Sequence, residues 1–496
     1  MTAPVLAARA RRSWPAARGR PGVPWLALVA AGYAAVQLAL IVPRMRHGLG
    51  WDESVYVSQA DPRRPAAFFS APRSRGTSVL VAPVVAATSS VTVLRVVLAL
   101  LASAALYAAF RTWRPLVGRG AAALAALLFA GLWITVLSGS QAMPNLWVAL
   151  GAVAAVGWFL RVPAERRALV WLAALMAAVT LVRAPDGGWL ALPLVAAAAC
   201  HRPWRPALAA LAGGLALGAA QWVYEAYDRF GGVPERLRVS SDTEGGMAPH
   251  LNTDTALRSL NGPLLCRPCD QPLEHVELTL WWLALPALAA GALAWGVRRR
   301  RVRPLGPTAV PLACAVLLAV PYLFLIDYSA PRFLLPAYAL AALPLAALAV
   351  HAVRRTGRPG PAAAVLGLVF ALHLSGQYGV ARDNADGAAA TARDYRTIAA
   401  GLRDLGLRPP CLVTGSRALP VGYAGGCASA EVAGNNRSTT ASGLLRRAAR
   451  EPTALLAYGR AAPPAYARGW TRHDLPGTAW TAYLAPTPDA SSPRRR

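Results

Sequence analysis

Long apolar segments separated by short arginine-rich segments constrain the fold of this 496-residue chain more than any other feature. A helix needs about 20 mostly apolar residues to cross roughly 30 Å of hydrocarbon. Several of the apolar segments are short and rich in alanine, but eleven approach this length. They are residues 24–42, 91–110, 121–138, 146–160, 168–182, 187–200, 206–224, 278–296, 308–327, 333–351 and 361–380. The pattern predicts an all-α polytopic membrane protein with about 11 transmembrane helices.

The charged residues indicate an orientation. All 51 basic residues are arginine, against 23 acidic residues, so the net charge is +28. If residues 1–23 lie inside and the spans alternate, 21 arginines and a single acid, Glu165, fall in the inner segments. An arginine excess on the cytoplasmic side is the bias expected of membrane proteins. We therefore expect a multi-pass protein of the cell membrane with a cytoplasmic N-terminus. No clear small-x-small cleavage site ends the first apolar run near Val42-Pro43, so we also expect the first span to be uncleaved.

The absence of lysine excludes several classes of chemistry. P-loop nucleotide hydrolysis, pyridoxal-phosphate catalysis and protein kinase activity each require a particular lysine. A net charge of +28 would indicate nucleic-acid binding in a soluble chain. Here the arginines lie between membrane spans, so we expect the lipid bilayer, and no nucleic acid, as their partner.

The topology divides the chain into parts of different character. A basic cytoplasmic segment precedes the membrane domain, which carries two large outer loops and is followed by an extracytoplasmic tail. Helical spacing at 395–405 and 444–450, with strand-like runs at 411–414, 454–458 and 480–484, predicts a small α/β domain in this tail. The predicted parts are 1–23, 24–380 with outer loops 43–90 and 225–277, 381–485, and a disordered tail at 486–496.

The cysteines agree with this sidedness. Cys266 and Cys269 share the second outer loop, and Cys411 and Cys427 share the tail. Disulfides are typical of extracytoplasmic regions, so both pairs are disulfide candidates. A redox or metal motif at 266–269 is the alternative, although no further histidine or cysteine ligands have suitable spacing.

Chemistry-bearing residues gather at the outer ends of the spans. Asp52, Glu53 and Tyr56 open the first outer loop. Charged groups near membrane depth are costly and usually functional. Others at the same side are Arg73, Arg75, Arg95, Arg183, Asp186, Asp327 and Arg332.

Each of these residues also has a structural interpretation. Arg95 could extend to the membrane interface, and Arg332 could pair with Asp327. Asp186 could be a turn residue, and Tyr56 an interface anchor. The loop 225–277 is equally compatible with a flap over a site and with a plain solvated loop.

Three motifs resemble those of the GT-C glycosyltransferases, in particular protein O-mannosyltransferases and lipid A aminoarabinose transferases. They are Asp52-Glu53-x-x-Tyr56, Arg183-Ala-Pro-Asp-Gly187, and Pro331-Arg332-Phe-Leu-Leu-Pro336-Ala-Tyr338. Phe333 stands where this family usually has a tyrosine, and some members have thirteen spans. From the first to the last, the three motifs span nearly the whole membrane portion of the chain, whereas the tail resembles no known family.

The resemblance implies an inverting transferase that moves a sugar from a polyprenyl-phosphate carrier to an acceptor hydroxyl on the outer face. The sugar would be mannose or an arabinose-type sugar, and the acceptor a glycan, a lipid or a protein. Asp52 would be the general base, with Glu53 as second choice or orienting partner. Arg332, Arg95, Arg75 and Arg73 would bind the donor phosphate. No cofactor is expected, and no metal is required because arginine can neutralise the phosphate. A divalent metal stays open as an alternative, since some branches of the family use one.

Three other functions remain open at this point. A multi-pass transporter or flippase of lipid-linked or cell-envelope intermediates is the main alternative, although the acids lie at outer ends and no inverted repeat is visible. A non-catalytic scaffold would make the acidic pair incidental. A polysaccharide polymerase or ligase is chemically adjacent to the transferase.

Overall fold

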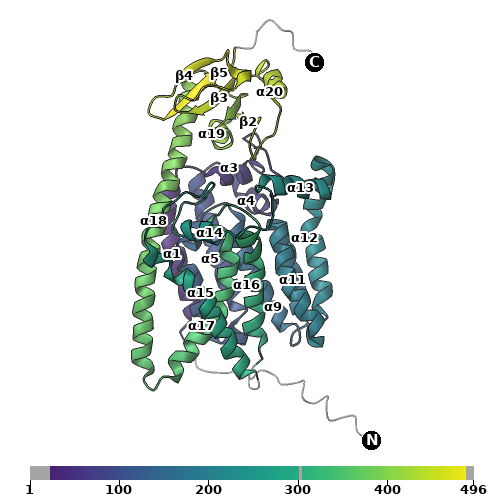
Figure 1. The fold of residues 1–496 in the computed structure, drawn as a ribbon, viewed down its shortest axis with the longest axis vertical. Coiled ribbons are helices and arrows are strands. Elements are labelled where there is room, and N and C mark those ends of the chain that lie inside the picture. The colour runs from purple at the N-terminus through teal and green to yellow at the C-terminus, as the bar shows by residue number, and fades with distance from the viewer. Residues whose placement is uncertain (1–22, 301–303, 487–496) are drawn as a thin grey trace.

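The structure, a computed structural model, describes residues 23–300 and 304–486. The predicted basic segment 1–23, apart from its last residue, and the predicted tail 486–496, apart from its first, lie outside this range. Helices stand side by side in a bundle, and a small sheet domain lies at one end of it (Figure 1).

All eleven predicted spans are helical. Most correspond to one helix each, while the first combines α1 (Trp25–Val36), a π-helical turn at Gln37–Ile41 and α2 (Val42–Met45), and the third combines α7 (Arg119–Ala130) and α8 (Trp133–Ser138). The others are α5 (Val91–Arg111), α9 (Pro144–Arg161), α10 (Arg167–Val182), α11 (Ala184–Cys200), α12 (Ala207–Phe230), α15 (Leu280–Arg299), α16 (Gly306–Phe324), α17 (Leu335–Arg355) and α18 (Pro359–Asp404).

Eight helical segments of the described chain are long and apolar enough to cross a membrane. Three predicted spans are shorter apolar helices, namely α7, α10 and α11. A short apolar helix packed among neighbours can lie at membrane depth because protein rather than lipid covers its ends. The chain is therefore a multi-pass membrane protein, with shorter apolar helices beside its full-length spans.

Small residues set the packing of the bundle. Gly214 and Gly218 on α12 face α10, where an added Cβ would lie 2.6 Å from the carbonyl oxygen of Ala173 and 2.4 Å from that of Ala177. Such a four-residue spacing of glycines lets two helix backbones approach closely. These two glycines therefore allow α10 and α12 to pack closely.

Helix α18 joins the bundle to the sheet domain without a break. It runs for 46 residues, along one side of the bundle and up to the sheet (Figure 1). The boundary expected at 380/381 therefore lies inside a helix and not in a linker. No proline occurs between Pro361 and Pro409, so nothing in the sequence forces the helix to end earlier.

The terminal domain is a mixed five-stranded sheet with strand order β2-β1-β3-β5-β4. Strand β1 pairs in parallel with β2 and β3, whereas β5 pairs antiparallel with β3 and β4. The strands are β1 (Leu412–Gly415), β2 (Ala428–Ser429), β3 (Thr453–Tyr458), β4 (Thr471–Asp474) and β5 (Trp480–Leu484), with helices α19 (Ala418–Gly425) and α20 (Ala441–Ala448). The predicted α/β character of the tail is confirmed.

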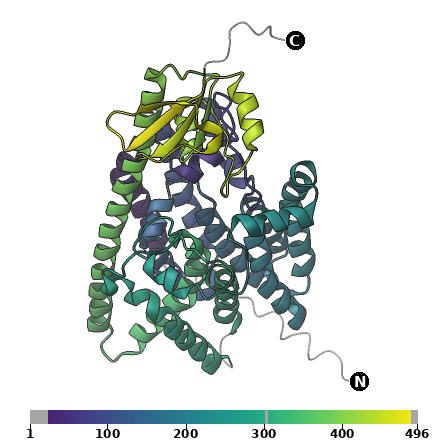
Figure 2. The ribbon, with the colours of Figure 1, turned by 45° about the horizontal axis from the view of Figure 1, so that its top comes forward.

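This domain packs against the first outer loop. Val55 and Tyr56 of α3 (Trp51–Ser58) share one apolar cluster with Ile398 of α18 and Leu419 of α19. Arg64 also donates a hydrogen bond of 2.7 Å to the carbonyl of Tyr423. Figure 2 shows the sheet standing over the end of the bundle, so the domain covers the region where α3 lies.

Candidate active site

A cavity of about 500 Å³ opens beneath the sheet domain, at the end of the bundle where α3 lies. The predicted residues that line it are Asp52, Glu53, Tyr56, Arg73, Arg183 and Arg332. Arg75, Arg95, Asp186 and Asp327 are not among its lining residues. The structure therefore brings together predicted groups from three widely separated parts of the chain and places the other four elsewhere.

The two adjacent carboxylates lie in the first turn of α3 and have different environments. Successive residues of a helix are about 100° apart around its axis, so neighbours point to different sides. The Asp52 side chain is 29% exposed at the cavity, whereas the Glu53 side chain is 4% exposed. One carboxylate is available to a ligand, and the other is part of the interior.

Asp52 is held by two arginines. Its Oδ1 accepts a hydrogen bond of 2.7 Å from Nη2 of Arg73, and its Oδ2 accepts one of 3.0 Å from Nη2 of Arg332. Burial raises the pKa of Asp52, but the charges of Arg73 and Arg332 outweigh burial and lower it below its ordinary value. Asp52 is therefore ionised at neutral pH, as a proton acceptor must be.

Glu53 and Arg95 form a buried pair with complete hydrogen bonding. The two Nη atoms of Arg95 donate to the two carboxylate oxygens of Glu53, each over 3.1 Å. Arg95 also donates to the carbonyls of Met45, Ser140 and Gly48, so all five of its N–H groups are used. Glu53 accepts two further bonds from backbone N–H groups.

Because all five N–H groups of Arg95 already donate hydrogen bonds within the protein, its predicted role has to be revised. Arg95 was predicted to bind donor phosphate, but no N–H of its guanidinium is free for a ligand, and its side chain is 2% exposed. The pair instead ties the start of α3 to α5 and to the loop before α9. Arg95 therefore holds α3 in position through Glu53, and α3 carries Asp52.

Three residues that line the cavity with Asp52 have unpartnered polar atoms. Nη1 of Arg73, Nε of Arg332 and both amide atoms of Asn145 are buried without a hydrogen-bond partner. Asn145 lies in the first turn of α9, whose N-terminus carries partial positive charge. Buried donors are normally satisfied, so these three N–H donors are available to a polar group or an anion that enters the cavity.

Asn145 was not recognised in the sequence, although a signal existed. The dipeptide Pro144-Asn145 opens a span, and proline is favoured at the first position of a helix. A polar residue directly after such a proline lies at a membrane surface. That position would have placed Asn145 beside the outer ends of the other spans.

A second buried network fixes the backbone that carries Arg73. Arg236 of α13 (Val233–Thr243) is fully buried and donates to the carbonyls of Ala71 and Arg73, each over 3.0 Å. It also pairs with Glu225 at 3.2 Å. Glu225 in turn binds Arg75 at 2.5 Å, so Arg75 is engaged away from the cavity.

Two other predicted acids are placed apart from Asp52. Asp186 is buried, accepts a hydrogen bond of 2.6 Å from the hydroxyl of Tyr322 and pairs with Arg183 at 3.6 Å. Asp327 is exposed and does not pair with Arg332, which binds Asp52 instead. The structural alternative in which Arg332 pairs with Asp327 is thus wrong.

The second outer loop forms a wall of the cavity, with Glu244, Leu264 and Arg267 among the lining residues. The Leu264 carbonyl accepts a hydrogen bond of 2.7 Å from Arg332. The guanidinium of Arg267 lies over the ring of Tyr328, whose hydroxyl donates to Glu244. Residues 225–277 therefore contribute to the cavity wall and are not a plain solvated loop, while a role as a flap that binds acceptor stays a prediction.

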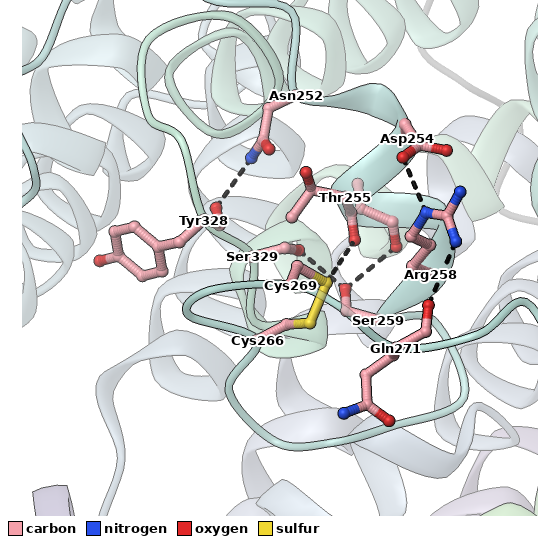
Figure 3. The surroundings of a disulfide bond; sticks show 11 residues. Asn252, Asp254, Thr255, Arg258, Ser259, Cys266, Cys269, Gln271, Tyr328 and Ser329 are labelled. Carbon is pink, nitrogen blue, oxygen red and sulfur yellow. Dashed lines mark hydrogen bonds and ion pairs between the residues drawn. A yellow bond between two sulfur atoms is a disulfide. The ribbon is translucent and has the colours of Figure 1, made fainter.

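A disulfide braces this wall. Cys266 is bonded to Cys269, and Cys266 forms a backbone bridge with Ser329, next to Tyr328 (Figure 3). The hydroxyl of Ser259 donates to that of Ser329 over 2.8 Å. The other candidate pair, Cys411 and Cys427, is also bonded, between the start of β1 and the strand beside it.

The sheet domain contributes residues that the sequence did not reveal. Arg417, Asn435 and Asn436 line the cavity, and Arg417 donates a hydrogen bond of 3.2 Å to the hydroxyl of Tyr395. Arg417 has φ +65°, a left-handed conformation that is uncommon for a residue with a side chain. No motif marks these residues, because their place depends on how the domain packs on α3.

A second cavity of about 600 Å³ adjoins the first. The two share Trp51, Leu264 and Arg417, and the second extends to Asp383 and Asn384 on α18. Together they form two chambers that meet beside α3.

The charge of the first cavity is strongly positive. Five arginines line it against three carboxylates, of which Glu53 is already paired with Arg95. Within residues 23–300 and 304–486, no group of three or more histidine, cysteine, aspartate or glutamate side chains could hold a metal ion. Arginine is thus the group this site offers to an anion, in a fork that suits phosphate.

Comparison with solved structures finds similar folds. The ArnT protein of Cupriavidus metallidurans bound to undecaprenyl phosphate has a TM-score of 0.63 and 14% identity, over 95% of this chain and 99% of that one. The oligosaccharyltransferase of Archaeoglobus fulgidus in its apo form has a TM-score of 0.52 and 13% identity, over 87% of this chain and 69% of that one. No family model and no curated protein matches the sequence.

These likenesses extend over most of the chain, including the sheet domain in the case of ArnT. The chain therefore has the GT-C fold that its three motifs led us to expect.

Proposed function

We propose that this protein is an inverting glycosyltransferase that acts at the outer face of the cell membrane. It moves a sugar from a polyprenyl-phosphate carrier to an acceptor hydroxyl. One observation carries the proposal: Asp52 lies in a positively charged cavity with each carboxylate oxygen held by a different arginine. The GT-C fold and the binding of undecaprenyl phosphate by ArnT of Cupriavidus metallidurans support the same class of donor.

The chemistry follows from these groups. The acceptor oxygen attacks the anomeric carbon while the bond from that carbon to the phosphate oxygen breaks, and a single displacement inverts the centre. The proton of the acceptor passes to the Asp52 carboxylate. The phosphate keeps the electron pair and gains a negative charge, which Arg332 and Arg73 stabilise.

Donor binding would also change the basicity of Asp52. In the free protein Arg73 and Arg332 hold the pKa of Asp52 low, which makes it a weak base. A phosphate that engages the same two arginines draws their charge away from the carboxylate. The pKa of Asp52 then rises as the donor binds, so the base gains strength when it is needed.

The orientation belongs to the same proposal. The loop between α17 and α18 lies at the bundle end far from the sheet (Figure 1). The last turn of α17 and the loop after it hold Arg354, Arg355 and Arg358, as a cytoplasmic segment would. The disulfides and the cavity lie at the other end, so we place the site and residues 381–485 outside. Alkaline phosphatase fused after the last residue should be active if this orientation is right.

The two chambers suggest separate places for donor and acceptor, with Arg73 and Arg332 on the donor side. The sugar would be mannose or an arabinose-type sugar, and the acceptor a glycan, a lipid or a protein. The test is to supply membranes that contain the protein with polyprenyl phosphate carrying labelled mannose or labelled arabinose. Label should appear in one of the lipid, glycan or protein fractions above a vector control. No transfer from any carrier sugar to any fraction would contradict the proposal.

A further inference from the structure

A groove of about 990 Å³ runs along the bundle between α5, α9 and α10, outside the active site. At one end it is lined by Gly76 and Val182, close to the first cavity. Its middle is apolar, with Leu150 and Leu175 among the lining residues. Helix α9 has 18 residues, or about 27 Å at 1.5 Å per residue, so the groove follows most of a bilayer core.

Arginines and aromatic rings occupy the far end of the groove. Arg111 and Arg114 lie over the ring of Tyr107, at 5.9 and 5.4 Å. On the other side Arg161 lies 4.0 Å from the ring of Trp158, which stacks on Trp171. Tryptophan and tyrosine prefer the headgroup level of a membrane, so this end lies where lipid phosphates lie.

The charge of this end is not balanced by the protein. Glu165 pairs with Arg161 at 2.6 Å and with Arg167 at 2.8 Å, so one carboxylate serves two arginines. Within residues 23–300 and 304–486, no ion pair joins Arg111 or Arg114 to a carboxylate. Guanidinium groups that stack on rings keep their N–H edges free for the oxygens of a phosphate.

We propose that this arginine end binds the headgroup of an anionic diacyl phospholipid, whose acyl chains lie in the apolar groove. Basic pockets between membrane helices on the cytoplasmic side bind such lipids elsewhere. The site is distinct from the Asp52 cavity, and the proposal does not depend on the transfer reaction. A bound phospholipid of this kind explains why the groove extends well beyond the Asp52 cavity and ends at arginines without carboxylate partners.

Native mass spectrometry of the full-length protein tests the proposal, after delipidation and addition of phosphatidylglycerol or phosphatidylcholine. Wild-type protein should retain phosphatidylglycerol in preference to phosphatidylcholine. The double variant R111Q/R114Q should weaken that retention about tenfold or more, since it removes both guanidinium groups that have no carboxylate partner. The control R354Q/R355Q removes the same charge from exposed positions on α17 and should retain the lipid.

A second variant tests the groove itself without changing the charge of the protein, and at an exposed position that should not disturb folding. Ala108→Phe fills the groove from an exposed lining position of α5 and should also reduce retention. Equal retention of the two lipids by wild-type protein would overturn the proposal. So would equal loss in R111Q/R114Q and R354Q/R355Q, or a retained species whose mass is that of polyprenyl phosphate.

Discussion

Arg332 and Asp52 are 280 positions apart in sequence, yet Nη2 of the arginine lies 3.0 Å from Oδ2 of the aspartate. The same guanidinium donates from Nη1 to the carbonyl of Leu264. One side chain therefore connects the first outer loop, the second outer loop and the start of a late span. Its Nε has no partner, so it can add a ligand without giving up these contacts.

Arg332→Lys should weaken use of the donor even though it keeps the charge. A lysine ammonium cannot contact Leu264, Asp52 and a phosphate in the planar fork that arginine provides. We expect the KM for the polyprenyl-phosphate sugar to rise about tenfold, which corresponds to roughly 1.4 kcal/mol. Transfer rates at varied donor concentration measure this. Arg382→Lys, on the exposed side of α18, is the control, and an equal effect of both changes would contradict the assignment.

Arg95→Gln should destabilise the protein more than it alters donor affinity. It leaves Glu53 buried with only two backbone partners, and breaking a buried ion pair costs roughly 3–5 kcal/mol. Thermal unfolding in detergent should show a lower melting temperature, with partial recovery in the double variant E53Q/R95Q. A stable Arg95→Gln protein with a raised donor KM would instead support the sequence-based prediction that Arg95 binds phosphate.

Arg236 and Arg238 provide a matched pair on one helix. Arg236 is buried and holds the backbone of Arg73, whereas Arg238 is exposed and pairs with Glu235 and Asp242. Arg236→Gln should lower both the melting temperature and the transfer rate, because Arg73 loses its support. Arg238→Gln should change neither by much, since exposed ion pairs contribute about 0–1 kcal/mol. Similar behaviour of the two variants would show that the network around Arg73 is not needed.

Glu431 should make the stability of the sheet domain depend on pH. Burial raises the pKa of this carboxyl from 4.5 to about 7. The folded protein therefore binds a proton that the unfolded chain releases, so stability falls as pH rises from about 4.5 to 7. Melting temperatures at pH 5 and pH 8 should differ more for wild type than for Glu431→Gln. Parallel profiles would contradict this, and Glu451→Gln, at a carboxylate paired with Arg447, is the control.

The sequence was sufficient for the fold class because hydropathy and charge act locally along the chain. The spans, the two disulfide pairs and the strand at 480–484 follow from such local signals. The continuity of α18 through 380/381 could not be seen, since a drop in hydropathy at a membrane surface does not end a helix. The apolar segments likewise did not show that three of the predicted spans, α7, α10 and α11, are shorter helices.

The candidate site was only partly predictable. Adjacent carboxylates on a helix must point to different sides, but the sequence does not say that Arg95 would bury Glu53 while Arg332 meets Asp52. These pairings depend on packing between distant segments. Arg417 and Asn436 depend on the docking of a whole domain, which leaves no motif.

The most direct test of the account compares sugar transfer by wild type, Asp52→Asn and Asp254→Asn, in membranes with equal amounts of each protein. The Asp52→Asn change keeps the size of the side chain but removes the group that accepts the acceptor's proton, so transfer should fall at least about a hundredfold. Asp254 is exposed and pairs with Arg258 outside the cavity, so its variant should match wild type. Equal transfer by wild type and Asp52→Asn, above a vector control, would remove Asp52 as the base and contradict the account.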